Sequence, residues 1–462
     1  MKDTIAAIST PAYGSGGIAI IRISGDEAVG TADRIFKAAS GKALTDTVSH
    51  TINYGHIVDM KTGEIIDEVL VSLMRGPASF TTQDTVEINC HGGIFVTKKI
   101  LEEVFKAGAR PAEPGEFTKL AFLGGRIDLA EAEAVADIIN ARSELSLKTA
   151  QNQLSGKVSE KIRDLRSHIL DHIAFAEAAM DDPEHIDMEG HLAELTRDLE
   201  DIDADISRLL RTFNEGKIIK EGINTVILGR TNAGKSSLFN LLSGSESAIV
   251  TDIEGTTRDM VKESVILGDL VLNIIDTAGI RKTDDKVEAI GVSKALEAAE
   301  NADLVIHVMD GTVAPEKEDF EIAKRLQGKK RIVVINKSDL GKGITDMDIE
   351  ALYPGEDVGI AEISSLTGEG VESLEQKVKE MFHLGEIRVN EEPVIASSRH
   401  KALLESAKES LRKVKDGIDA GFTEDLLTID LTDAYSSLGF IIGEEIEDDL
   451  ADRIFEKFCM GK

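Results

Sequence analysis

The chain has 462 residues, of which 42% are hydrophobic and 29% are charged, a balance that excludes disorder over most of its length. So long a chain rarely folds around one hydrophobic core, and we therefore expect two to four domains. Its 52 Lys and Arg face 84 Asp and Glu, a net charge of −32, so any nucleic acid must be held at a local basic patch or through a partner.

The cysteines and apolar runs indicate the cellular compartment. Cys90 and Cys459 lie far apart and form neither a disulfide framework nor a metal-binding pair. Pro11 and three glycines interrupt the first apolar stretch, so no signal-peptide core is expected. No run approaches the roughly 20 apolar residues that a membrane helix needs. We expect a cytoplasmic protein with no membrane contact.

The first predicted domain comprises residues 1–118. Short β-branched runs at 18–23, 68–73 and 85–89 are separated by glycine-containing turns, and two helical stretches near 27–37 and 94–107 interrupt them. This pattern predicts a small α+β domain.

Residues 119–218 and 383–462 show the helical period, and residues 219–382 alternate strand and helix, as in a doubly wound α/β sheet. We expect the two helical parts to form one helical bundle domain into which the α/β domain is inserted. Two separate helical pieces are the alternative. Among the positions expected on packed helix faces are Leu129, Ala132, Val135, Ile139, Val158, Ile162, Leu165, Ile169, Leu404, Ala407, Leu411 and Val414.

A phosphate-binding loop follows the predicted strand 224–228. The segment GRTNAGKS, residues 229–236, matches G-x-x-x-x-G-K-[ST]. It lies between a predicted strand and an apolar helical stretch, which is the context that this motif requires. Glycines let backbone N–H groups surround the phosphates, Lys235 reaches the β and γ oxygens, and Ser236 is a Mg²⁺ ligand. Asn232, Ala233, Gly234 and Ser237 complete the expected contacts.

Three further motifs follow in order on successive predicted strands. Asp339, in the second of these motifs, can accept hydrogen bonds from both the ring N–H and the exocyclic amine of guanine, whereas adenine lacks that pair of donors. Any one motif could be an ordinary turn, but together they predict a GTP-binding domain. They are Asp276-Thr277-Ala278-Gly279, Asn336-Lys337-Ser338-Asp339 and Ser364-Ser365-Leu366.

Between the first two nucleotide motifs lies a polar segment typical of a switch loop. We expect Thr257 to be the second Mg²⁺ ligand, and a solvated loop without a metal role is the alternative. The segment reads Thr251-Asp252-Ile253-Glu254-Gly255-Thr256-Thr257-Arg258-Asp259.

With these motifs the chain resembles the MnmE (TrmE) family of tRNA-modification GTPases over essentially its whole length. The resemblance is carried by residues 232–237, 255–259 and the terminus Phe458-Cys459-Met460-Gly461-Lys462, with similar N-terminal text at 21–25, 91–93 and 114–117. Thr231 and Met460 stand where the family commonly has proline and isoleucine, and neither change removes a functional group.

The resemblance implies a Ras-like GTPase domain, an N-terminal folate-binding domain that forms a homodimer, and a flavoprotein partner, MnmG. It implies modification of the wobble uridine of tRNA at its five-position with an aminomethyl or carboxymethylaminomethyl group, using 5-formyl- or methylene-tetrahydrofolate. Arg22, Glu87, Arg126 and Lys462 would contact the folate. Without the resemblance, Arg22 and Glu87 read as polar strand residues.

Hydrolysis needs a group that orients the attacking water. Ile280 stands where Ras-type GTPases have glutamine, and the resemblance implies that Glu288 takes this role. An exposed acid at a helix start, like Asp284 and Asp285, is the alternative. Cys459 is expected to approach the one-carbon unit, and a small apolar filler is the alternative there.

The resemblance also implies a K⁺ ion that supplies positive charge to the phosphates. Carbonyl and amide oxygens suit such an ion. Its expected ligands are Asn232, Thr251, Ile253 and Thr256, and Arg258 and Arg281 are rival sources of charge.

Two other function classes remain open at this point. A GTP-switched ribosome-assembly or signalling factor would usually carry a basic RNA-binding module, which the sequence lacks. A folate-binding structural dimer with a vestigial GTPase is disfavoured because every nucleotide motif is intact.

Overall fold

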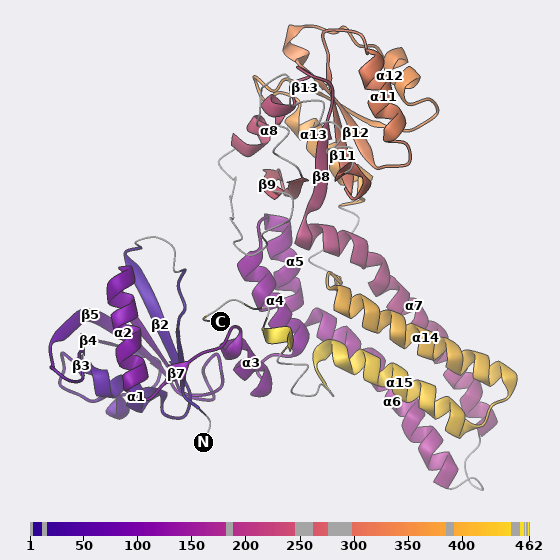
Figure 1. Ribbon diagram of the computed structural model, residues 1–462. Coiled ribbons are helices and arrows are strands. Elements are labelled where there is room, and N and C mark those ends of the chain that lie inside the picture. Colours follow the sequence, from indigo (N-terminus) through magenta and orange to yellow (C-terminus); the bar gives the residue numbers. More distant parts are fainter. Residues whose placement is uncertain are drawn as a thin grey trace. The chain divides into compact units, whose positions relative to one another are not determined.

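The computed structural model describes residues 3–11, 16–181, 188–244, 262–275, 298–384, 392–444, 453–456, 458 and 461. The chain forms two compact units, and most of their helices and strands are labelled in Figure 1. The first contains Met1–Ala136, Ile162–Leu170 and Tyr435–Lys462, and the second contains Asp137–Lys161 and Asp171–Ala434.

A seven-stranded sheet with the order β3-β4-β5-β6-β2-β1-β7 builds the N-terminal part of the first unit. All neighbours pair antiparallel except β1 and β7. Helices α1 and α2 pack on one face, where alternate strand residues such as Ile21, Ile23, Val86 and Ile88 are buried. The α+β prediction is confirmed. The elements are β1 (Ile5–Ile8), β2 (Ile18–Ser24), α1 (Ala28–Ile35), β3 (Phe36–Ala38), η1 (Leu44–Asp46), β4 (Thr51–Val58), β5 (Ile65–Met74), β6 (Thr85–His91), α2 (Ile94–Lys106) and β7 (Arg110–Pro111).

Helices make up the flanking segments. Helix α14 packs along α7, and Lys415 on α14 pairs with Glu200 on α7 at 3.0 Å. The periodic positions of α6 and α14 are buried, but Ile139 at the end of α4 is 42% exposed, because the last turn of α4 borders a cavity. The helices are α3 (Glu116–Leu123), α4 (Leu129–Asn140), α5 (Glu144–Leu154), α6 (Lys157–Asp181), α7 (Met188–Glu221), α14 (Ser398–Ala420) and α15 (Glu424–Ile442).

A six-stranded sheet in the order β13-β12-β11-β8-β10-β9 lies within the second unit. Its strands are parallel except β9, and the central ones are continuous apolar runs because both faces are covered. Helices α8 and α13 cover one face, and α11 and α12 cover the other. The doubly wound prediction is confirmed. The elements are β8 (Ile223–Leu228), α8 (Lys235–Gly244), β9 (Lys262–Leu267), β10 (Leu270–Ile275), β11 (Leu304–Asp310), α11 (Lys317–Arg325), β12 (Arg331–Asn336), η2 (Ser338–Leu340), α12 (Asp346–Leu352), β13 (Gly359–Ile363) and α13 (Val371–Met381).

Parallel pairing brings the carboxyl ends of β8, β11, β12 and β13 to one edge of this sheet. Ligands of doubly wound sheets bind at that edge. Within the described ranges, no helix is both long and apolar enough to cross a membrane.

Candidate functional site

The loop after β8 has a backbone that two glycines make possible. Gly229 has φ +154°, and a Cβ atom there would lie 2.2 Å from the carbonyl oxygen of Val308. Gly234 has φ +96°, and its Cβ would lie 2.0 Å from Nδ2 of Asn336. Asn232 takes the left-handed conformation with φ +65°, which asparagine tolerates better than most residues. The loop therefore curls tightly before α8 begins.

Lys235 opens α8 and folds over this loop. Its Nζ donates to the carbonyl oxygens of Gly229 and Arg230, both at 2.8 Å. The ammonium group and the N–H groups at the start of α8 both favour negative charge here. Ser236 follows in the first turn of the helix. The loop and helix start are thus arranged to receive phosphate groups.

Asn336 connects three predicted motifs from the end of β12. Its side chain is buried, and Nδ2 donates to the carbonyl oxygen of Ala233 at 3.1 Å. Its Oδ1 accepts from the backbone N–H of Ser365 at 3.1 Å and from the Ser365 hydroxyl at 2.8 Å. One amide therefore holds the phosphate loop and the loop after β13 together.

Asp310 at the end of β11 was not predicted from the sequence. Its carboxylate pairs with Lys337 Nζ at 2.5 Å and accepts from the hydroxyl and N–H of Thr312. Burial alone would raise the pKa of Asp310, but the hydrogen bonds from Lys337 and Thr312 lower this pKa to about 2. The available signal was a polar Asp-Gly-Thr run directly after a buried strand. The pair fixes Lys337, which has φ +64°.

A cavity of about 560 Å³ opens beside these residues. Asp339 lines it, and the apolar side chains of Leu340 and Leu366 border it while remaining 68% and 86% exposed. Exposed leucines beside a carboxylate suit a flat base that stacks on apolar groups and donates from its edge. The cavity is lined by Gly234, Ser237, Asn240, Leu241, Asn336, Lys337, Asp339, Leu340, Ser365 and Leu366.

The structure thus brings the phosphate loop, the Asn336–Asp339 motif and the Ser364–Leu366 motif to one cavity. The predicted switch loop, the second nucleotide motif and the hydrolytic residues lie outside the described residues. These are Thr251, Asp252, Ile253, Glu254, Gly255, Thr256, Thr257, Arg258, Asp276, Thr277, Ala278, Gly279, Arg281 and Glu288.

Three of the four residues expected to contact folate lie together in the first unit. Arg22 and Glu87 face each other across β2 and β6 and form an ion pair at 2.8 Å. The guanidinium groups of Arg22 and Arg126 lie near the Phe80 ring, at 5.8 Å and 5.6 Å from its centroid. The Arg126 guanidinium also donates to the Ser79 carbonyl oxygen at 2.5 Å. Two cations and an aromatic ring thus share one surface.

The end of the chain lies against the first strand of the same unit. The Ser9 hydroxyl donates to the carbonyl oxygen of Gly461 at 3.0 Å. Gly461 has φ +83°, and a Cβ there would lie 2.4 Å from the Ile8 carbonyl oxygen. Cys459 and Lys462 themselves lie outside the described residues.

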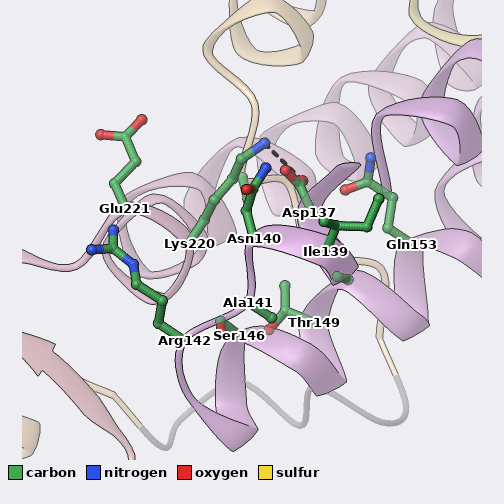
Figure 2. Close-up of a pocket in the computed structure, with 12 residues that line it drawn as sticks. Asp137, Ile139, Asn140, Ala141, Arg142, Ser146, Thr149, Gln153, Lys220 and Glu221 are labelled. Carbon is green, nitrogen blue, oxygen red and sulfur yellow. Dashed lines mark ion pairs between the residues drawn. The ribbon is translucent and has the colours of Figure 1, made fainter. Parts of the chain in front are cut away.

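A second, larger cavity of about 640 Å³ lies within the second unit, where the helices meet the α/β sheet (Figure 2). Lys220 on α7 pairs with Asp137 on α4 at 2.7 Å. Arg142 donates to the Ser264 hydroxyl on β9 at 2.7 Å. The lining of this cavity includes two cations, Arg142 and Lys220, and two acids, Asp137 and Glu221. It therefore favours neither an anionic nor a cationic ligand. None of the residues predicted to bind a ligand lines it.

The doubly wound sheet, the glycine-dependent phosphate loop and the guanine-suited cavity define a P-loop GTP-binding protein. Comparison with known proteins gives the particular family. The model of the GTP-binding protein TrmE N-terminus matches residues 4–126, and the MnmE helical domain model matches residues 129–459.

Curated relatives agree with these models over the full length. A protein named tRNA modification GTPase MnmE from Lachnoclostridium phytofermentans is 51% identical over 461 residues, covering 100% of this chain and 99% of the relative. The Geobacillus kaustophilus protein of the same name is 46% identical with the same coverage. Among solved structures, the G domain of the T. maritima FeoB iron transporter is 28% identical over 34% of this chain and 98% of that chain, with a TM-score of 0.26. The chain belongs to the MnmE family of tRNA modification GTPases, which confirms the family resemblance of its sequence.

Proposed function

We propose that this protein is the GTP-hydrolysing subunit of a complex that modifies the wobble uridine of tRNA. The observation that carries the proposal is the buried Asn336 amide, which joins the phosphate loop to the loop beside the base cavity. The full-length identity to proteins named tRNA modification GTPase supports the tRNA part. A ribosome-assembly factor is not favoured by these relatives.

GTP fits the cavity with its phosphates over the Lys235 loop and its guanine beside Asp339. Lys235 and the start of α8 bind the phosphates, and Asp339 accepts hydrogen bonds from the base. Ser236 would hold Mg²⁺, since a hydroxyl oxygen at this helix start suits a hard cation. Bound there, Mg²⁺ would neutralise phosphate charge. Thr257 as the second ligand stays a prediction.

K⁺ is the second proposed metal. Among the described residues, Asn232 offers a side-chain amide oxygen on an exposed loop, which is the ligand chemistry that K⁺ requires. Thr251, Ile253 and Thr256 remain predicted ligands, and Glu288 remains the predicted group that orients water.

Tetrahydrofolate is proposed to bind at Arg22, Glu87 and Arg126. The guanidinium groups suit the carboxylates of a folate tail, and Phe80 offers a ring on which a flat heterocycle can stack. The Glu87 carboxylate can accept from a ring N–H. Bound folate would supply the one-carbon unit, and Cys459 and Lys462 are the predicted contacts from the end of the chain.

A homodimer through the N-terminal domain is proposed from the sheet face that α1 and α2 do not cover. Tyr54 and Leu70 are direct cross-strand partners there, and both are about half exposed. Ile52 on the same strand face is 69% exposed. A neighbouring group of exposed apolar side chains marks an interaction surface.

The flavoprotein MnmG is the proposed partner in the cytoplasm. A chain with net charge −32 repels tRNA, so a second protein with positive surface would help to hold the substrate.

Nucleoside mass spectrometry of tRNA tests the function. A strain lacking this protein should lose the modified wobble uridine, the wild-type chain should restore it, and Lys235→Ala should not. The matched surface variant Lys148→Ala should restore it fully. Unchanged wobble uridines in the deletion strain would overturn the proposal.

A further inference from the structure

A histidine lies inside the most buried strand of the nucleotide-binding sheet. His307 occupies the middle of β11, between aliphatic neighbours, and is fully buried. Its Nδ1 lies 2.6 Å from the hydroxyl of Tyr353, beyond the end of α12. Burial, with a smaller effect of the nearby Arg331 charge, lowers the pKa of His307 to about 4, so the ring is neutral. The tautomer with the ring proton on Nε2 is the one in which the Tyr353 hydroxyl donates to Nδ1.

The Nε2 atom faces a buried carboxylate. Asp319 on α11 is 1% exposed, and its Oδ1 lies 3.9 Å from His307 Nε2. Neither atom has another hydrogen-bond partner among the described residues. A shift of about 1 Å closes this gap into a direct hydrogen bond. Buried polar atoms rarely stay unpaired, and Nε2 and Oδ1 are unsatisfied atoms on the two sides of this gap.

The same carboxylate reaches the phosphate loop. Oδ2 of Asp319 accepts from the Glu316 backbone N–H at 2.9 Å and lies 3.8 Å from Nε of Arg230. Arg230, whose side chain is only 12% exposed, also pairs with the Glu316 carboxylate. Arg230 is the second residue of the phosphate loop, and its carbonyl oxygen accepts from Lys235 Nζ.

We propose that His307 and Asp319 are positioning residues for nucleotide binding. His307 donates to Asp319 and keeps it ionised, and ionised Asp319 anchors Arg230 and thereby the backbone that Lys235 contacts. This inference rests on the proposed GTP site but concerns residues outside its cavity.

The charges around Asp319 decide how it titrates. Burial raises the pKa of Asp319, the hydrogen bond from the Glu316 backbone N–H and then the Arg230 charge act against this, and the nearby Glu316 charge adds to it. Without a donor from His307, the carboxyl would take up a proton nearer neutral pH and release Arg230. The other groups on the packed elements are Asp310 at the end of β11, Arg331 on β12 and Tyr353 beyond α12, with Glu356 paired to Arg331.

The test measures the affinity of the full-length chain for a fluorescent GDP analogue from about pH 6.5 to 8.5, as the ratio of variant to wild type, which cancels the titration of the nucleotide. His307→Leu should bind about tenfold more weakly at the low end and recover towards wild type at the high end. Asp319→Asn should be weakened about equally throughout. The double variant should follow Asp319→Asn, because the carboxyl group whose titration shapes the profile is absent from both.

Two further variants make the result decisive. His400→Leu removes another fully buried histidine, on α14, and should leave the affinity ratio flat at one. Tyr353→Phe keeps the ring and removes the hydroxyl beside Nδ1, so the ring proton is no longer held on Nε2. The profile should therefore shift in the same direction as for His307→Leu but by less, which provides a test if His307→Leu does not fold. A flat profile in Tyr353→Phe and in folded His307→Leu overturns the inference. Failure of the wild type to bind the analogue would instead overturn the nucleotide site.

Discussion

Asn336→Asp tests whether one buried amide organises the nucleotide site. The substitution keeps shape and keeps Oδ1 as the acceptor for both Ser365 donors. It replaces the Nδ2 donor, 3.1 Å from the Ala233 carbonyl oxygen, with a second acceptor in a position that is 1% exposed. Only the connection to the phosphate loop is therefore lost.

The expected cost follows from that geometry. An unpaired buried carbonyl costs about 1–3 kcal/mol, and placing a carboxylate oxygen against it adds repulsion. A total of about 3 kcal/mol corresponds to roughly a hundredfold weaker binding of guanine nucleotide. Fluorescence titration with a GDP analogue measures it, with Asn301→Asp, at an exposed position outside the cavity, as the matched control. A folded Asn336→Asp protein that binds within about threefold of wild type would refute the reasoning.

Four further outcomes are expected. Asp310→Asn should lower the free energy of unfolding by about 1–2 kcal/mol at neutral pH, and since its folded pKa lies below the unfolded value, chemical denaturation should show this difference shrinking as pH falls from about 4 towards 2. Asp339→Asn should cost a few kcal/mol of GTP affinity, because an amide cannot accept both guanine donors; undiminished affinity would contradict the base assignment. GTP turnover should be faster in K⁺ than in Na⁺ at equal ionic strength, and equal rates would exclude the ion site. Cys459→Ser should retain folding and GTP hydrolysis but lose tRNA modification in cells; normal modification would make the thiol structural.

Local patterns in the sequence predicted the strands at 18–23, 68–73 and 85–89, the strand before the phosphate loop and the loop itself, because strand period and loop chemistry are set by adjacent residues. The strands β1, β3, β4 and β7 of the first sheet and β9 of the second were not predicted. The buried faces of α6 and α14 followed from helical spacing in the same way. Spacing could not predict that Ile139 is exposed, since a helix face is buried only as far as its neighbours extend.

The contacts that organise the site join residues distant in sequence, and no local pattern encodes them. Asn336 was predicted as part of a base-binding motif, yet its amide contacts Ala233, 103 positions earlier. The pairing of Lys337 with Asp310 depends on the parallel register of β11 and β12. His307 is a single polar residue within an apolar run of β11, and only the fold shows that it faces Asp319.

The segment that follows the nucleotide-binding sheet and leads into α14 packs closely against α7. The backbone N–H of Ile395 donates to the Thr212 hydroxyl at 3.0 Å, and at Gly216 a Cβ would lie 2.4 Å from the Ile395 carbonyl oxygen. The segment before α14 is thus held against α7 about three turns before that helix leads into β8. Gly216 therefore leaves no space for a side chain where the two segments meet. A methyl group at Gly216 would push Ile395 away from α7 and weaken this contact, while every residue that lines the GTP cavity stays unchanged.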